Sequence, residues 1–390
     1  MITAKMTNRL KTERISIAAV GDISFQGRHA NNPSSEPFRN IAHMLRSHDL
    51  VIGNLECPLV VGGTYLPNKC CLRGSPNWAG ILKESRFDVL SLANNHIMDY
   101  GPSGLYQTLD VLDGAGILHV GAGRTLQEAN APLLMGRAGE KIAVLARSSV
   151  IVRSPCYASE RQPGAAFLNE KELISNIREC KRGADIVILL MHWGIEEYVL
   201  PSPEQRMWAK KFAMAGADLI LGHHPHVLQG VERVGNSLVA YSLGNFLFDE
   251  FEWELATENG IHRKIYSGLS PENREGLLLK IRKEGSDTEF SCEGIYTKIA
   301  DDAHIYLNTE PPRNMMLECI SEDFSKFFYN QKWHLYSIKK EWDLRLRSKF
   351  SLHNIMINIR KLRPHHFRET IGMIRRSLKI AFGKSTNPYD

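Results

Sequence analysis

The chain has no long apolar run and no paired cysteine motif, and each absence argues against a class of protein. No uninterrupted apolar segment approaches the roughly 20 residues that a membrane-spanning helix needs. The seven cysteines are scattered without a CxxC pair, so neither a zinc ribbon nor a dithiol redox site is expected. We therefore expect a chain without a membrane-spanning helix, whose reduced cysteines take no part in its chemistry.

The first 14 residues also lack the apolar segment of a secretory leader, because they are polar up to the first predicted strand. We expect a cytoplasmic protein. Its hydrophobic content of 43% and charged content of 23% are typical of a globular chain. A length of 390 residues predicts about two domains, or one large domain with an appendage.

The modest net charge of +5 is concentrated near the C-terminus, where residues 360–384 hold eight Lys or Arg against the single acidic residue Glu369. Apolar residues at helical spacing on one side of this segment predict a basic amphipathic helix. Such a helix fits either peripheral contact with an anionic membrane or packing on the main domain with its basic face in solvent. Nucleic-acid binding is not expected, since no aromatic interleaving or known motif accompanies the charge.

The chain changes character near residue 303. Before this point, apolar strand-like segments alternate with helical ones, which is typical of an α/β domain. After it, apolar residues recur at helical spacing, among them Phe328, Leu335 and Ile338. We therefore predict a main domain of residues 14–302 and a helical extension of residues 303–390.

Three histidines within four residues, His223, His224 and His226, follow the apolar run of residues 219–222. Such a run is typical of a buried parallel strand, and in open α/β sheets ligands bind just beyond the carboxyl ends of the strands. Imidazole is a common metal ligand, and two imidazoles separated by the rigid Pro225 can face one ion. The segment predicts a metal site, although a turn that is rich in histidine by chance gives the same pattern.

The same arrangement, a polar side chain directly after an apolar strand, recurs along the chain. The carboxyl ends of parallel strands meet along one edge of a sheet, so these groups would converge on one cleft. Carboxylate, amide oxygen and imidazole are ligands for Zn, Mn or Fe, and an open site of this kind supports hydrolysis. Besides the three histidines, the residues concerned are Asp22, Asn54, Glu56, Asn95, His96 and His192.

Each of these residues also has a local explanation. Asp22 could cap the helix that follows it, and Asn54 and Asn95 could hold turns through local hydrogen bonds. His192 could be a buried core histidine beside Trp193. The metal-site interpretation is wrong only if all of these local explanations are correct at the same time, so we favour the metal site.

Aromatic and basic residues near the strand ends have two interpretations as well. Trp193, Tyr241 and Phe246 could line a substrate groove, but aromatic residues beside a strand end more often belong to the core. Arginines in predicted loops could contact an anionic polymer, although a solvated charge is the more common situation. These arginines are Arg73, Arg147 and Arg153.

Six short motifs around these residues resemble, in the same order, those of the CapA family, the poly-γ-glutamate capsule biosynthesis proteins. This family is related to the calcineurin-like metallophosphoesterases. The resemblance covers roughly residues 15–297 and does not extend to the C-terminal part. The motifs are Gly21-Asp22, Gly53-Asn54-Leu55-Glu56, Leu92-Ala93-Asn94-Asn95-His96 with Asp99-Tyr100-Gly101, His192-Trp193-Gly194, Gly222-His223-His224-Pro225-His226-Val227-Leu228-Gln229 and Tyr241-Ser242-Leu243-Gly244-Asn245-Phe246.

The resemblance implies a four-layer α/β/β/α sandwich with the site at the strand ends. It also implies one or two divalent ions, Mn, Fe or Zn, with Glu56 in the place of a bridging aspartate. His224 and His226 reproduce a His-x-His pair and are preferred over His223 as ligands. The full set of implied ligands is Asp22, Asn54, Glu56, Asn95, His192, His223, His224 and His226.

For catalysis, the resemblance points to His96 and Asp99, with His96 as the proton donor to the leaving group. One departure from the pattern affects the number of metal ions. Dinuclear metallophosphoesterases begin with Asp-x-His, whereas Asp22 is followed here by Ile23 and Ser24. This predicts that one of the two metal positions is weak or missing.

Two functional hypotheses follow. In the first, the chain is a metal-dependent hydrolase in the synthesis or export of an anionic polymer, poly-γ-glutamate or a capsular polysaccharide, with attack by metal-bound hydroxide. The polymer or its precursor would then be its partner. In the second, the chain is a non-catalytic accessory or scaffold protein of a polymer synthase complex, and its metal site is structural or vestigial. The serine in the Asp-x-His position favours the second hypothesis.

Overall fold

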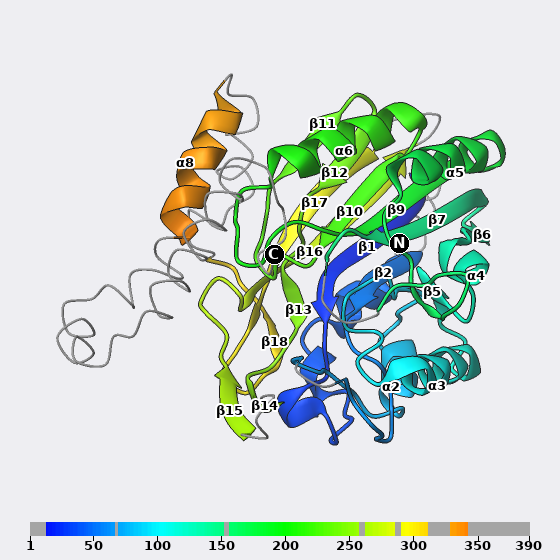
Figure 1. The fold of residues 1–390 in the computed structure, drawn as a ribbon. Helices are drawn as coiled ribbons and strands as arrows, with labels where there is room; N and C mark the ends of the chain where they lie inside the picture. Colours follow the sequence, from blue (N-terminus) through cyan, green and yellow to red (C-terminus); the bar gives the residue numbers. More distant parts are fainter. Residues whose placement is uncertain are drawn as a thin grey trace, which may run out of the picture.

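Two β-sheets pack face to face, and helices cover their outer faces (Figure 1). The structure is a computed structural model that describes residues 13–66, 69–151, 156–256, 262–284, 290–310 and 328–341. The predicted basic helix near the C-terminus and Arg153 lie outside these described residues.

The larger sheet has eight strands in the order β18-β17-β16-β1-β2-β3-β4, and β13 pairs with β1 off this path. The strands β1 to β4 run parallel to one another, while β16 to β18 are antiparallel. The strands of this sheet are β1 (Glu13–Ile23), β2 (Leu50–Leu55), β3 (Val89–Ser91), β4 (Leu118–Val120), β13 (Asn245–Leu247), β16 (Glu275–Glu284), β17 (Phe290–Ile299) and β18 (Ile305–Leu307).

The smaller sheet has six strands in the order β11-β12-β10-β9-β7-β6. Its four central strands are parallel, and the two edge strands are antiparallel to their neighbours. All seven residues of β9 are buried, as expected for a parallel strand that is covered on both faces. The strands are β6 (Leu133–Arg137), β7 (Glu140–Ser148), β9 (Ile186–His192), β10 (Leu219–His223), β11 (Val231–Val234) and β12 (Ser237–Ala240).

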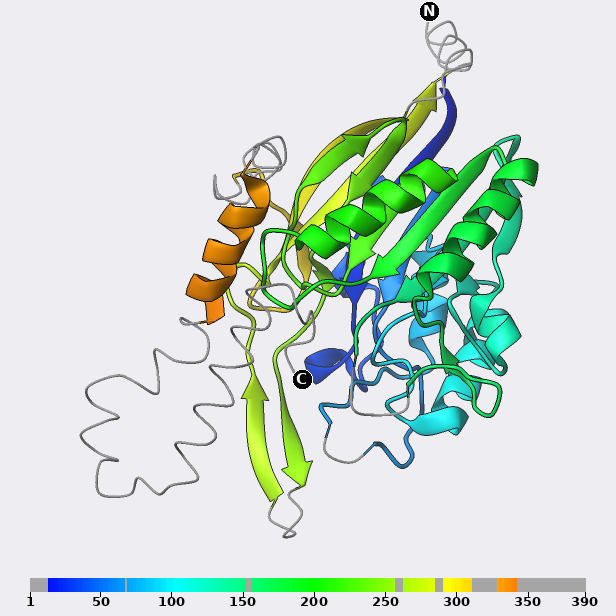
Figure 2. The same cartoon turned by 45° about the horizontal axis from the view of Figure 1, so that its top comes forward.

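Two strand pairs stand apart from the sheets: β5 (Ala122–Gly123) with β8 (Gly164–Ala165), and β14 (Phe251–Ala256) with β15 (His262–Ser267). Figure 2 shows that the pair β14–β15 extends away from the body of the molecule. The helical segments are η1 (Gly27–His29), η2 (Glu36–Phe38), α1 (Ala42–Arg46), α2 (Trp78–Glu84), α3 (Gly101–Gly114), α4 (Leu126–Asn130), α5 (Glu170–Gly183), α6 (Pro203–Ala215) and α8 (Tyr329–Glu341).

Three apolar cores separate four layers. Alternate residues of β1 face different cores: Ile17 belongs to the core between the two sheets, and Val20 belongs to the core under helices α1 to α3. The third core joins the smaller sheet to α5 and α6, with Leu189 of the sheet packed in the same cluster as Phe212 of α6. The predicted four-layer α/β/β/α sandwich is therefore confirmed.

Helix α6 begins and ends where its sequence predicts. Ser202 accepts a hydrogen bond from the backbone N–H of Gln205, whose side chain in turn accepts from the backbone N–H of Ser202, forming a capping box. Pro203 occupies the first helical position, and Gly216 ends the helix with a left-handed φ of 114°. These signals fix the length of the loop between β9 and α6.

Helix α8 packs on this loop with a face that the apolar spacing does not predict. Leu335 and Phe328 are 70% and 65% exposed, respectively. The buried side of the helix carries Tyr329 and Trp333 instead, which are 3% and 2% exposed and join the third core. These side chains suit the position because each combines an apolar ring with a hydrogen-bond donor for the carbonyl groups of a loop.

In the ranges that the structure describes, we find no helix with both the length and the apolar character needed to cross a membrane.

Candidate metal centre

The register of the parallel strands places the predicted ligands side by side. In the larger sheet, Asp22 at the end of β1 is paired with Asn54 on β2 and with Asn245 on β13. In the smaller sheet, His192 at the end of β9 is paired with His223 at the end of β10. The carboxyl ends of both sheets thus contribute donor groups to one buried region.

Asp22 links the two sheets through its carboxylate, which is fully buried. Asn54 Nδ2 donates to Asp22 Oδ1 at 2.8 Å, and the backbone N–H of His224 donates to Asp22 Oδ2 at 3.1 Å. His226 Nδ1 lies 3.5 Å from Asp22 Oδ2. The aspartate therefore both holds the histidine turn in place and presents an oxygen next to an imidazole.

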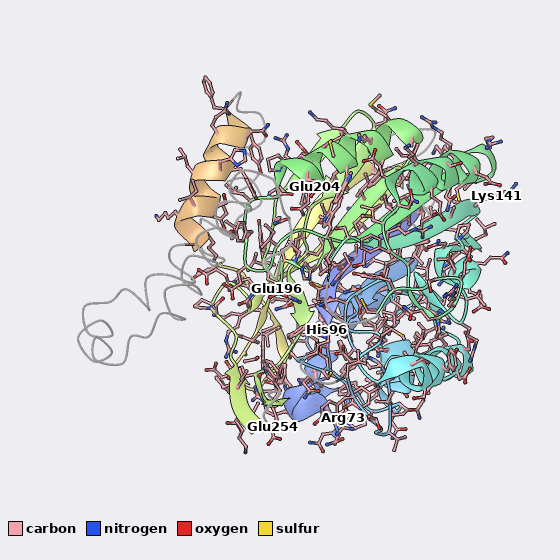
Figure 3. The ribbon with its side chains drawn as sticks, viewed as in Figure 1. Arg73, His96, Lys141, Glu196, Glu204 and Glu254 are labelled. Atoms are coloured by element: carbon pink, nitrogen blue, oxygen red, sulfur yellow. The ribbon has the colours of Figure 1, made fainter. Side chains whose placement is uncertain are left out.

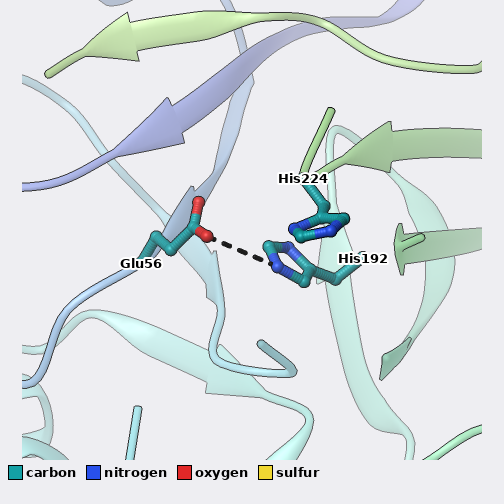
Figure 4. Close-up of side chains that lie close together, drawn as sticks. All are labelled: Glu56, His192 and His224. Atoms are coloured by element: carbon teal, nitrogen blue, oxygen red, sulfur yellow. Dashed lines mark ion pairs between the residues drawn. The ribbon is translucent and has the colours of Figure 1, made fainter. Parts of the chain in front are cut away.

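Glu56, immediately after β2, is the centre of the cluster. Its Oε1 lies 3.4 Å from His192 Nε2 and 3.6 Å from His226 Nε2, and its side chain is fully buried. Within the described part of the chain, neither carboxylate oxygen of Glu56 nor Nδ1 of His224 has a hydrogen-bond partner. Figure 4 shows that Glu56, His192 and His224 point toward one another.

A buried carboxylate among imidazoles is costly unless something compensates its charge. Burial raises the pKa of Glu56 well above its ordinary value, and the nearby carboxylates of Asp22 and Glu196 raise it further. Burial lowers the pKa of both His192 and His224 well below the usual value, so both imidazoles are neutral near pH 7. Neutral imidazole is the form that binds metal, and a divalent ion would compensate the carboxylate.

Among the residues that the structure describes, three groups of side chains could hold an ion, because their ligand atoms lie within 4.8 Å of one another. Asn95 extends the first of these groups, since its Oδ1 lies 2.8 Å from His192 Nε2. The groups are Glu56 with His192 and His224, Asp22 with Glu56 and His226, and Glu196 with His224 and His226.

Two of the predicted ligands have other contacts. His223 Nε2 lies 3.2 Å from the backbone oxygen of Val20, and His223 belongs to none of the three groups. Asn54 uses its amide nitrogen for Asp22 and accepts a hydrogen bond from Asn94 at 3.3 Å. Both residues therefore connect neighbouring strand ends, and neither is part of the three groups.

The predicted catalytic pair lies beside the three groups that could hold an ion. His96 Nδ1 is 2.7 Å from Asp99 Oδ2, and Asp99 is fully buried. The same carboxylate accepts hydrogen bonds from the backbone N–H of Leu72 and from Lys69 Nζ, and Lys69 Nζ also donates to the backbone oxygen of Asn95. Burial lowers the pKa of His96. Asp99 and Lys69 thus orient the histidine and its neighbour Asn95.

Sequence reasoning missed three residues of this site. Glu196 lies four positions after His192, so a search for carboxylates near the strand ends could have found it. Asn245 stands in a quoted motif without a role, and its Oδ1 lies 2.9 Å from His226 Nδ1. Lys69 lies in a loop without any motif, and no sequence signal identifies it.

The aromatic and basic residues have structural roles. Trp193 and Tyr241 are fully buried, and the Trp193 indole N–H donates to the backbone oxygen of Tyr241 at 2.9 Å, so both belong to the core. Arg147 is 1% exposed at the end of β7, and its guanidinium donates to backbone oxygens of Ala146 and Asn130. Its interpretation as a loop charge that contacts a polymer is therefore wrong. Arg73 donates to Asn31 Oδ1 in an exposed contact.

We expect the substitution Glu56→Gln to stabilise the metal-free protein at pH 8 by about 1–3 kcal/mol, because the buried carboxyl group of the wild type must either stay charged without a hydrogen-bond partner or take up a proton on folding. A raised carboxyl pKa in the folded state contributes stability below the unfolded pKa of about 4.3, which is lost as the pH rises through the folded pKa. The difference in the free energy of unfolding between the variant and the wild type should therefore grow between about pH 5 and pH 8. Urea denaturation in the presence of a chelator measures it.

Added divalent metal should reverse this order, since it stabilises the wild type and not Glu56→Gln. The control is Glu275→Gln, because Glu275 is also buried but pairs with Asn308 and is in none of the three groups. Its response to metal should equal that of the wild type. A Glu56→Gln protein that is less stable than the metal-free wild type at pH 8 would contradict the assignment of an uncompensated charge.

The known proteins that resemble this chain match the same part of it that carries the candidate site. A family model described as bacterial capsule synthesis protein PGA_cap matches residues 16–250, which include every residue of the three groups. The chain is 34% identical to the capsule biosynthesis protein CapA of Bacillus anthracis over 253 residues, or 62% of this chain and 61% of that protein. It thus spans less than two thirds of that relative's own length.

Two further relatives match over the same region. The PGA biosynthesis protein CapA of Bacillus subtilis is 34% identical over 63% of this chain and 67% of its own length. A probable polyglutamine synthesis accessory protein of Mycobacterium tuberculosis is 30% identical over 52% of this chain and 56% of its own length.

Solved structures match with low sequence identity. A hypothetical protein from Thermus thermophilus is 13% identical, covers 73% of this chain and 99% of its own, and has a TM-score of 0.42. The NAD nucleotidase of Haemophilus influenzae is 15% identical, covers 80% of this chain and 56% of its own, and has a TM-score of 0.43.

Proposed function

Because this chain belongs to the bacterial capsule synthesis protein family, we propose that it is a metal-dependent hydrolase in the synthesis or export of an anionic polymer. The names of the two Bacillus relatives, which refer to capsule and PGA biosynthesis, support poly-γ-glutamate or a related capsular polymer as the substrate class. The polymer or its precursor is then the binding partner, and a synthase complex is the proposed setting. We propose that the protein works in the cytoplasm.

One observation carries the hydrolase proposal: the fully buried carboxylate of Glu56 lies among imidazoles without a hydrogen-bond partner in the described part of the chain. The donor set fits a divalent cation, because carboxylate, amide oxygen and neutral imidazole together suit Mn, Fe or Zn. We assign Asp22, Glu56 and His226 to one ion position. A second position consists of Glu56, Asn95, His192 and His224.

A bound divalent ion would supply positive charge that activates water and stabilises the negative charge of the transition state. The chain's own residues then handle the proton. Asp99 also accepts from the Leu72 N–H and from Lys69, so it is the acceptor for His96 Nδ1–H. The charge of Asp99 favours the imidazolium form of His96, which also carries a hydrogen on Nε2, and this Nε2 proton is the one delivered to the leaving group. Lys69 holds both Asp99 and the backbone of Asn95, so it fixes the donor relative to the metal position.

The second candidate function is that of an accessory protein with a structural or vestigial metal site. Ser24 supports it, because it stands where Asp-x-His has its histidine, is fully buried, and accepts a hydrogen bond at Oγ from the backbone N–H of Gln26. The Mycobacterium tuberculosis relative is itself named as a probable accessory protein of polyglutamine synthesis.

Metal analysis of the purified chain, combined with hydrolysis assays on γ-glutamyl amides and phosphoesters, separates the two functions. We expect stoichiometric divalent metal, and turnover that disappears after chelation and returns after the metal is restored. Metal without turnover on either substrate class would favour the accessory function. A chain that takes up no metal at all would remove the basis of the hydrolase proposal.

A further inference from the structure

The loop between β9 and α6, residues 193–202, brings one more carboxylate to the histidine turn. The Glu196 carboxylate and the imidazoles of His224 and His226 offer ligand atoms that lie within 4.8 Å of one another. Figure 3 labels Glu196 and His96 in the central part of the molecule, where both are visible from the same side. Neither the ion positions assigned above nor any sequence motif uses Glu196.

Backbone hydrogen bonds hold this loop against the histidine turn on its inner side. The N–H of Trp193 donates to the carbonyl of His223 at 3.1 Å, and the N–H of Glu197 donates to the carbonyl of Pro225 at 2.8 Å. These two bonds flank Glu196 in the sequence. The position of Glu196 relative to the imidazoles is therefore set by main-chain contacts and not by its own side chain alone.

The backbone at this contact is strained. Among the described residues other than glycine, six have a positive φ, and three of them are here: Glu197 at 62°, His224 at 94° and His226 at 57°. Such conformations are costly and persist where the surrounding structure enforces them, which occurs most often at functional sites. The strain thus indicates that this loop and the histidine turn are held in a required geometry.

Helix α8 holds the outer side of the same loop. Tyr336 Oη accepts a hydrogen bond from the N–H of Val199 at 3.0 Å, while Tyr329 Oη donates to the carbonyl of Pro201 at 2.6 Å. The indole N–H of Trp333 donates to the carbonyl of Leu200 at 3.2 Å. The family match ends at residue 250, so this support comes from a part of the chain beyond the matched region.

We propose that Glu196 is a direct metal ligand, which binds a divalent cation together with His224 and His226, and that α8 holds it in position. The inference rests on the proposed metal site and adds to it a third possible ion position, which shares His226 with the first position assigned above and His224 with the second. Two imidazoles and one glutamate form a complete protein ligand set for an open, catalytic type of zinc site.

Titration with Co²⁺ tests the ligand, because Co²⁺ reports both affinity and coordination through its visible absorption spectrum. We expect Glu196→Gln to weaken Co²⁺ binding at least about tenfold, since even residues outside the coordination sphere change metal affinity about 10–100-fold. The d–d absorption bands of the bound Co²⁺ should also change. An unchanged affinity, or a weaker affinity with an unchanged spectrum, would overturn the direct-ligand assignment.

The matched control is the adjacent Glu197→Gln. The Glu197 side chain is 40% exposed and lies 3.7 Å from Lys340, so it points to α8 and contributes little through this surface pair. Its affinity and spectrum should equal those of the wild type. Equal thermal unfolding of the two variants in the presence of a chelator shows that Glu196→Gln remains folded.

The role of α8 is tested by Tyr336→Phe, which removes only the hydroxyl that accepts from Val199. We expect a several-fold loss of Co²⁺ affinity with an unchanged absorption spectrum, because the ligands stay the same and only their positioning weakens. Leu335→Ala, at a position that is 70% exposed on the same helix, should have no effect. Equal affinities of these two variants would overturn the role of α8.

The outcomes separate this inference from the proposed function. A wild-type chain that does not bind Co²⁺ would remove both. Normal binding by the wild type, weakened by His192→Ala but not by Glu196→Gln, would retain the proposed metal site and remove only the inference.

Discussion

Replacing His96 with alanine is expected to lower turnover about 10²–10⁴-fold, the usual contribution of a positioned proton donor. The metal content should stay at the wild-type level, because His96 belongs to none of the three groups of potential ligands in the described residues. Steady-state kinetics on the substrate that the wild type hydrolyses, together with elemental analysis of the same sample, measures both quantities.

A second histidine provides the control for this experiment. His119, on the edge strand β4, also lies close to an aspartate, with its Nε2 3.0 Å from Asp113 Oδ1, but it is in none of the three groups that could hold an ion. His119→Ala should therefore keep full turnover. If His96→Ala also keeps it, the proton must come from another group, and the role given to the His96–Asp99 pair is wrong.

Gly222→Ala is expected to destabilise the fold by about 4 kcal/mol or more, a size that single substitutions reach only rarely. A Cβ atom at this position would lie 1.9 Å from the backbone oxygen of Tyr241 and 2.6 Å from Trp193 Nε1. The backbone oxygen cannot move away without breaking the contact between β10 and β12, whose strands are paired over residues 219–221 and 238–240. Urea denaturation of the metal-free protein measures the free energy of unfolding.

A glycine without close neighbours separates this packing effect from a general effect of the substitution. Gly80 is exposed within α2, and no atom lies within 4 Å of a Cβ placed there. Gly80→Ala should raise the free energy of unfolding by up to about 1 kcal/mol, because alanine favours a helix interior. A Gly222→Ala protein as stable as Gly80→Ala would show that the strand ends are less tightly packed than the structure indicates.

The layers and the convergence of most candidate site residues could be predicted, because both follow from strand periodicity. The apolar run before His223 and the run before His192 are buried parallel strands, so the polar residues at their ends had to meet at one edge. Asp22 and Asn54 occur together for the same reason. The local sequence pattern was sufficient to predict the position of a side chain wherever that side chain lies at the end of a strand.

The limits of prediction are visible within the histidine cluster itself. Neighbouring residues at the end of a strand face opposite directions, so His223 and His224 cannot share one ion without a turn between them. The sequence does not tell which of them faces the site, because this depends on where β10 ends. In the structure β10 ends at His223, and the chain turns at His224 with a left-handed φ of 94°.

Residues placed by tertiary contacts were not predictable from the local pattern. Lys69 reaches Asp99 from a loop 30 residues earlier in the chain, and no periodicity marks it. Helix α8 shows a related limit, because apolar spacing selected Leu335 while the helix packs through Tyr329 and Trp333. The orientation of this helix depends on hydrogen bonds to the carbonyl groups of the loop, and a hydrophobic pattern contains no information about such bonds.

The pairing of Asp22 with Asn245 has a consequence for when the proposed metal site can form. Chains fold from the N-terminus as they leave the ribosome, and these two positions lie more than 200 residues apart in the sequence. A growing polypeptide cannot place Asn245 beside Asp22 and His226 before β13 has emerged and joined β1. We therefore expect a cation to bind at the proposed site only late in biosynthesis, after β13 has joined the larger sheet.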